Sequence, residues 1–165
     1  MTPTARSSSP GQGLELYLAR YHEHLRQRGE ALVAKIPTPV QIRSRRGGAI
    51  TGVLQPPVWV DYAGVIAPSG RAVAIEAKVR PDRITLSDLE PHQRSTLAAV
   101  DAVGGVAIVY VRLTSSDLIV PWGEFVLRTS IRRDDGPWVR PPGRGWFAAA
   151  AAWASYEELG WEGVP

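Results

Sequence analysis

The sequence contains no cysteine, and among its 165 residues it has only one methionine and two phenylalanines. The lack of cysteine excludes a disulfide scaffold and every zinc site built from thiolates. No apolar run reaches the roughly 20 residues that a membrane helix needs. The first ten residues are rich in Ser, Thr and Pro and lack the apolar stretch of a signal peptide. These absences predict a cytoplasmic protein without a membrane association.

Lysine is also scarce, since 17 of the 19 basic residues are arginine. The planar guanidinium group fits phosphate, although a GC-rich genome produces the same bias. The charge is uneven along the chain: residues 1–60 carry eight basic and three acidic side chains, whereas residues 61–165 carry eleven and thirteen. The first part therefore has a net charge of +5, which suits a polyanionic partner. The second part has −2, which needs a separate explanation.

Composition and apolar periodicity predict a single α/β domain over residues 11–165, preceded by a disordered segment over residues 1–10. A strand, strand, helix and strand follow a first helix in this order, which is typical of the α/β class. The expected elements are a helix from Gly13 to about Gly29, strands over 58–66, 71–79 and 106–111, helices over 91–103 and 122–127, and a C-terminal helix at about 146–160.

Residues 43–57 differ in kind from the rest. They contain Arg43, Arg45 and Arg46, a Gly-Gly pair and a Pro-Pro pair, with little apolar material to bury. This composition predicts a basic hairpin or loop that projects from the domain.

The two strands over 58–66 and 71–79 bring chemically important side chains together. A turn centred between Pro68 and Ser69 pairs Asp61 with Glu76, which places their Cβ atoms about 5 Å apart. Lys78 follows Glu76 by two residues and therefore projects from the same face of the strand. Two carboxylates and one ammonium group are therefore expected on the same side of this pair of strands.

Two carboxylates at that separation repel each other by roughly 3 kcal/mol at an effective dielectric constant near 20. A folded protein offsets this repulsion by protonation, by a cation or by a metal ion. Hard oxygen ligands suit Mg²⁺ or Mn²⁺, which accept one or two carboxylates together with phosphate oxygens and water. An ordinary surface salt bridge among Asp61, Glu76 and Lys78 has the same spacing, so both interpretations remain open at this point.

The order of motifs resembles a known family. Asp61 and then Glu76-Ala77-Lys78 are similar to the core of the PD-(D/E)xK nuclease superfamily, and the surrounding residues resemble the RecU-type Holliday junction resolvases. The segments that carry this resemblance are Pro37-Thr38-Pro39-Val40-Gln41-Ile42, Asp61-Tyr62-Ala63-Gly64, Glu76-Ala77-Lys78, His92-Gln93 and Gly104-Gly105. The similarity extends from about Gly11 to Val111.

The resemblance implies a restriction-endonuclease-like fold, with a mixed central sheet flanked by helices and a projecting basic stalk. It implies that Asp61, Glu76 and the backbone carbonyl of Ala77 hold Mg²⁺, with Mn²⁺ as a substitute, and that Lys78 orients water or stabilises the phosphate. Gly11-Gln12-Gly13-Leu14-Glu15 resembles the family's first-helix motif, so Glu15 is expected to contribute a further acid.

The basic segment 43–57 resembles the family's stalk, which implies that Arg43, Arg45 and Arg46 contact the centre of a four-way DNA junction. Gln93 is a weaker candidate for a DNA contact, since a glutamine in the first turn of a helix is usually solvated.

Resolution of a two-fold symmetric junction by paired nicks implies a homodimer. Recombinase proteins are further candidate partners, and His22 and His24 are interpreted as surface residues.

Two alternatives remain open at this stage. A nuclease of the same fold that acts on linear duplex or flaps shares Asp61, Glu76 and Lys78. A protein that binds junctions and modulates recombination without cutting shares only the fold, and the intact set of three residues disfavours it.

Overall fold

The computed structural model describes residues 10–114 and 116–134, and a five-stranded sheet of order β1-β4-β5-β7-β8 lies at its centre. β5 and β7 run parallel, and every other pair of neighbours in this sheet is antiparallel. Helix α2 provides the crossover that the parallel pair requires. The bounds of these elements are β1 Ala31–Lys35, β4 Tyr62–Ile66, β5 Arg71–Val79, α2 Pro91–Ala102, β7 Val106–Arg112 and β8 Asp117–Pro121.

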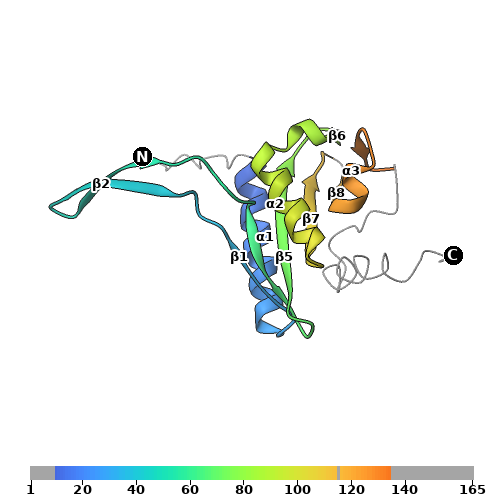
Figure 1. Ribbon diagram of the computed structural model, residues 1–165, viewed down its shortest axis with the longest axis horizontal. Coiled ribbons are helices and arrows are strands. Elements are labelled where there is room, and N and C mark those ends of the chain that lie inside the picture. The colour runs from blue at the N-terminus through green and yellow to red at the C-terminus, as the bar shows by residue number, and fades with distance from the viewer. Residues whose placement is uncertain (1–9, 115, 135–165) are drawn as a thin grey trace, which may run out of the picture.

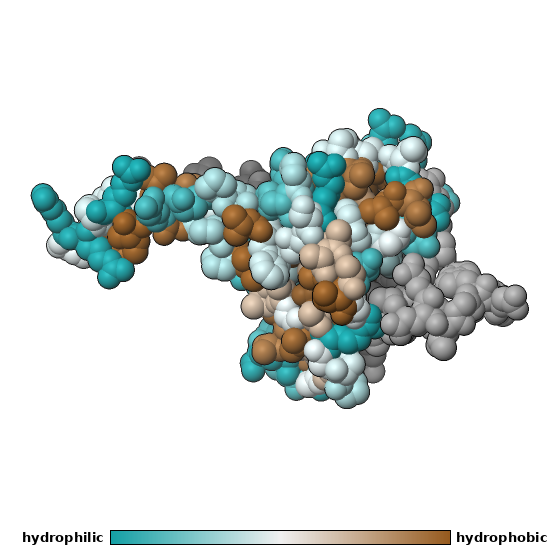
Figure 2. Space-filling model, in the orientation of Figure 1, coloured by the Kyte–Doolittle hydropathy of each residue, from teal (hydrophilic) through white to brown (hydrophobic). Residues whose placement is uncertain are grey.

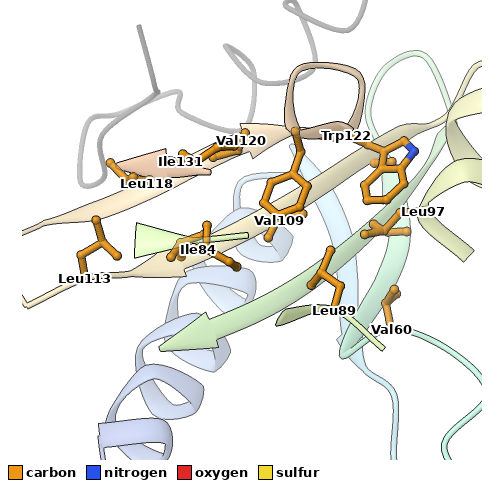
Figure 3. Packing of buried hydrophobic residues seen from close by; sticks show 14 residues of the cluster. Val60, Ile84, Leu89, Leu97, Val109, Leu113, Leu118, Val120, Trp122 and Ile131 are labelled. Carbon is orange, nitrogen blue, oxygen red and sulfur yellow. The ribbon is translucent and has the colours of Figure 1, made fainter. Parts of the chain in front are cut away.

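Helices cover both faces of this sheet (Figure 1). On one face, α1 (Pro10–Gln27) packs Leu18 against Ile75 and Ile108. On the other face, α2 and the short helix α3 (Trp122–Val126) pack against alternate residues of the same strands. Figure 3 shows this second core, in which Leu97 and Val109 belong to one cluster. The predicted mixed sheet flanked by helices is confirmed.

The pairing of β4 with β5 follows the predicted register, with Tyr62 opposite Ile75 and Ile66 opposite Arg71. The expected strand over 58–66, however, begins at Tyr62. Tyr62 is also the last residue that β1 pairs with, opposite Lys35. Pro37 lies two residues beyond Lys35 and has no N–H, so it cannot extend the ladder. The segment before Asp61 therefore leaves the sheet.

A long hairpin projects from the domain (Figure 1). Its strands β2 (Val40–Arg46) and β3 (Ala49–Leu54) pair only with each other, and every residue in them is exposed. Gly47 and Gly48 form the turn with φ of 53° and 81°, which is a backbone region that favours glycine. The predicted projecting hairpin is confirmed, but it begins at Val40, because Val40 already pairs with Leu54.

Helix α1 differs from the prediction in its first residue and in the burial of His22. It begins at Pro10, earlier than expected, and ends at Gln27. His22 was expected at the surface, yet its exposed fraction is 4 %. It lies on the same face as Leu14, Leu18 and Leu25, since these positions are three or four residues apart. The exposed position expected for His24 is confirmed.

The helices predicted over 91–103 and 122–127 and the strand over 106–111 are confirmed within a residue. Not among the predicted strands are β8 and the pair of β6 (Arg83–Ile84) and β9 (Ile131–Arg132). The predicted helix at about 146–160 and residues 1–9 lie outside the described residues. None of the helices in the described ranges combines the length and apolarity needed to cross a bilayer.

Candidate active site

Asp61 lies directly before β4, where the backbone holds it from two sides. Its carbonyl oxygen accepts a hydrogen bond of 2.8 Å from the N–H of Ile36. Its Oδ2 accepts one of 3.0 Å from the N–H of Ala77, across the β4–β5 pair. The carboxylate is thereby fixed beside the residue that follows Glu76, as the predicted register requires.

Glu76 is buried in the middle of β5, with an exposed fraction of 1 %. Its Oε1 accepts hydrogen bonds from Gln93 Nε2 at 2.6 Å and from Lys78 Nζ at 2.8 Å. Its Oε2 is buried and has no partner. Burial raises the pKa of Glu76 to about 7, repulsion by Asp61 adds to the increase, and Lys78 opposes it. The site therefore contains a carboxylate oxygen with an unmet need for a cation or a proton.

Gln93 orients this pair of charges from the first turn of α2. Its Oε1 accepts hydrogen bonds from Lys78 Nζ at 3.1 Å and from the N–H of Glu90 at 2.8 Å. Its Nε2 donates to Glu76, so the amide contacts both Glu76 and Lys78. The expectation of a solvated glutamine is wrong, because Gln93 is 9 % exposed. A DNA contact by Gln93 remains a prediction.

These residues line one cavity of about 340 Å³, together with residues from α1 and β1. Glu15, the predicted further acid, lies in its wall and forms an ion pair of 2.6 Å with Lys35. Both side chains of this pair are about half exposed. The cavity is lined by Gly11, Leu14, Glu15, Lys35, Asp61, Tyr62, Glu76, Ala77, Lys78, Val79, Arg80 and Gln93.

Sequence reasoning missed two cations of this cavity, Lys35 and Arg80. A signal for each was present. Lys35 and Lys78 are the only lysines of the chain, and both line the same cavity. Arg80 continues the two-residue spacing of Glu76 and Lys78. The cavity thus combines three carboxylates with three cations.

The three arginines of the basic segment lie elsewhere. Arg43, Arg45 and Arg46 are exposed on the projecting β2–β3 hairpin, and none of them lines the cavity. The structure therefore brings Glu15, Asp61, Glu76, Lys78 and Gln93 together and separates the hairpin arginines from them.

The donor set of the cavity fits a hard divalent cation. Glu76 Oε2 is without a partner, and Asp61 supplies a second carboxylate nearby. Residues 10–114 and 116–134 contain no group of three Asp, Glu or His side chains that would complete a shell alone. Mg²⁺ needs no such group, because it keeps several waters and takes one or two carboxylates plus phosphate oxygens. Two carboxylates in a cavity lined with cations are therefore suited to metal-assisted chemistry on a phosphate.

Comparison with known proteins identifies the family of this chain. The family model "Recombination protein U" (RecU) matches residues 9–125. A protein of Geobacillus kaustophilus (strain HTA426), named Holliday junction resolvase RecU, is 30 % identical over 139 residues, which are 74 % of this chain and 68 % of that protein. The structure of Archaeoglobus fulgidus Hjc, a Holliday junction resolvase, aligns with 13 % identity and a TM-score of 0.43, over 66 % of this chain and 77 % of Hjc. The family match covers more than half of the chain, so the chain belongs to the RecU family of recombination proteins.

Proposed function

We propose that this protein is a metal-dependent endonuclease that resolves four-way DNA junctions by paired, symmetric nicks during recombination and repair. The observation that carries the proposal is the unpartnered Oε2 of buried Glu76, which lies in one cavity with Asp61 and Lys78 in a member of the RecU family. A relative that is 30 % identical has the name of a Holliday junction resolvase, which supports this choice of substrate.

Asp61 and Glu76 would hold Mg²⁺, or Mn²⁺ in its place, with the backbone carbonyl of Ala77 as a third donor. The N–H of Ala77 donates to Asp61, and the N–H and C=O of one strand residue point to the same side, so this carbonyl faces Asp61 as well. When bound, the ion would polarise the scissile phosphate and lower the pKa of an attacking water.

Lys78 would stabilise the negative charge that develops on the phosphate, or orient the attacking water. Its ammonium group is already held at 2.8 Å from Glu76 and at 3.1 Å from Gln93, so little reorganisation is needed when DNA binds. Gln93 acts through these two groups and is therefore a positioning residue. Glu15 supplies a third carboxylate from the wall formed by α1.

The exposed hairpin would bind the centre of the junction through Arg43, Arg45 and Arg46. Each neutralised phosphate steepens the dependence of log K on log salt by about 0.9. A four-way junction needs two symmetric nicks, so we expect a homodimer with two such cavities. A cytoplasmic location and contacts with recombinase proteins belong to the same proposal.

The test compares an immobile four-way junction with linear duplex and flap DNA of the same sequence, each with Mg²⁺, with Mn²⁺ and with EDTA. We expect paired nicks in the junction that require the metal and leave duplex intact. If duplex or flap DNA were cleaved as fast as the junction, the proposed junction resolution would be wrong and the protein would be a nuclease of broader substrate range. Junction binding without nicking in any metal would contradict the enzyme and leave a binding protein.

A further inference from the structure

Arg80 follows β5 directly and continues the line of catalytic candidates. Its backbone N–H donates a hydrogen bond of 2.9 Å to the carbonyl of Arg112 on β7, so the hydrogen-bonded pairing of β5 with β7 continues to this residue. Alternation along the strand therefore places Glu76, Lys78 and Arg80 on one side. Arg80 also lines the same cavity as these two residues.

The guanidinium group of Arg80 is held in place from behind. Its Nε donates to Asp88 Oδ1 at 2.7 Å, and its Nη1 donates to the carbonyl of Val79 at 2.8 Å. Asp88 is itself anchored, because its Oδ2 accepts hydrogen bonds from the N–H and the Oγ1 of Thr85 at 2.7 and 2.8 Å. A side chain that is one-third exposed is thereby kept in one orientation.

The remaining donors of Arg80 are available to a ligand. Within the described part of the chain no hydrogen bond engages its Nη2, and a guanidinium group has five N–H donors in a fixed fork. That fork fits a phosphate group. The segment that contains Asp88 does not need this arginine to hold its position. Thr85 already holds Asp88, and partly exposed ion pairs contribute little to stability.

We infer that Arg80 binds a backbone phosphate of the cleaved strand next to the scissile phosphate, and so positions the strand in the cavity. The inference deepens the proposed function and rests on it. Lys78 is held at the reacting centre by Glu76 and Gln93, whereas Arg80 lies two residues farther along the chain, directly after the end of β5. Arg80 is therefore a positioning residue that is separate from the hairpin arginines.

The first test measures junction binding in EDTA at several salt concentrations, which requires no cleavage. Arg80→Ala should reduce the slope of log K against log salt by about 0.9, the value for one lost phosphate contact. Arg80→Gln should do the same while it keeps a donor for Asp88. The exposed Arg83, which does not line the cavity, provides the matched control Arg83→Ala with an unchanged slope. An unchanged slope in both Arg80 variants, with wild-type melting temperatures, would overturn the inference.

The second test locates the phosphate with junctions that carry one neutral methylphosphonate at successive positions. At one position beside the cut, the neutral group should weaken binding to the wild type but not to Arg80→Gln. Equal weakening of both proteins at every position would contradict a direct contact. The two hypotheses are separable: if the wild type never nicks junctions, the proposed function fails, whereas these binding measurements still decide the role of Arg80.

Discussion

The cavity and the hairpin use charge in opposite ways. In the cavity, Glu76 is buried, and hydrogen bonds from Gln93 and Lys78 fix the position of its Oε1. On the hairpin, all strand residues are exposed and the arginines stand among exposed apolar residues, as Figure 2 shows on the projecting arm. Buried charges set chemistry at short range, whereas exposed ones are screened by salt and contribute mainly to association. The comparison predicts that the two regions can be impaired separately.

Asp61→Asn is expected to have the largest effect, because it removes a carboxylate on which the proposed metal binding depends. We expect nicking of the junction to fall by on the order of 10³-fold, the equivalent of several kcal/mol of transition-state stabilisation. Junction affinity should remain within a few-fold, since the hairpin is unchanged. Rates and affinities are measured on the same preparation, with Asp101→Asn on the exposed end of α2 as control. If a folded Asp61→Asn variant lost junction affinity together with activity, the prediction that cavity and hairpin can be impaired separately would be wrong.

His22 allows a test of the domain on which the cavity is built. Burial lowers the pKa of His22 to about 4, from the ordinary value of 6.5. At His22 the unfolded chain therefore binds more protons than the folded chain between these values, so the contribution of His22 to stability falls as the pH decreases from about 6.5 to about 4 and changes no further below that. The loss amounts to about 3 kcal/mol.

Urea unfolding at several pH values measures this loss as the difference between the wild type and His22→Phe. The phenyl ring keeps the edge-to-face packing on Tyr62, whose ring centroid lies 4.9 Å away. Glu76 titrates in both proteins and cancels in the difference. His24→Gln, on the exposed face of α1, should keep the wild-type profile. A difference that does not change with pH would show that His22 is protonated as easily in the folded state as in the unfolded one.

Gln93→Ala should reduce cleavage less, by about 10- to 100-fold, as is usual for groups that orient metal ligands from outside. The substitution deprives both Glu76 Oε1 and Lys78 Nζ of a partner but leaves both charges in place. The turnover number should fall while binding in EDTA stays constant. Ser95→Ala, on the exposed side of the same helix, is the matched control. A parallel loss of binding would instead support the DNA contact predicted for Gln93.

The sequence predicted what depends on local spacing, and it failed where tertiary contacts decide. The pairing of β4 with β5 follows from one turn, and the juxtaposition of Asp61 with Glu76 follows from that pairing. The burial of Glu76 does not, because it requires α2 on the same face. His22 shares its spacing with the buried leucines of α1, so the pattern contained the answer and the polar residue type concealed it. The contact of Arg80 with Asp88 closes a loop that no periodicity describes.

The hairpin arginines should have the smallest effect on the domain, even when all three are replaced by alanine. Arg43, Arg45 and Arg46 are exposed and lie on a hairpin that pairs only with itself, so the free energy of unfolding should change by no more than about 0.5 kcal/mol for each. The slope of log K against log salt for junction binding should nevertheless fall by up to about 0.9 for each lost phosphate contact. At saturating DNA the nicking rate should stay close to the wild-type rate, because the cavity is intact. A slower rate at saturation with an unchanged salt slope would instead place these arginines in the catalytic step, and the distinction between a buried reactive cavity and an exposed DNA-binding arm would have to be abandoned.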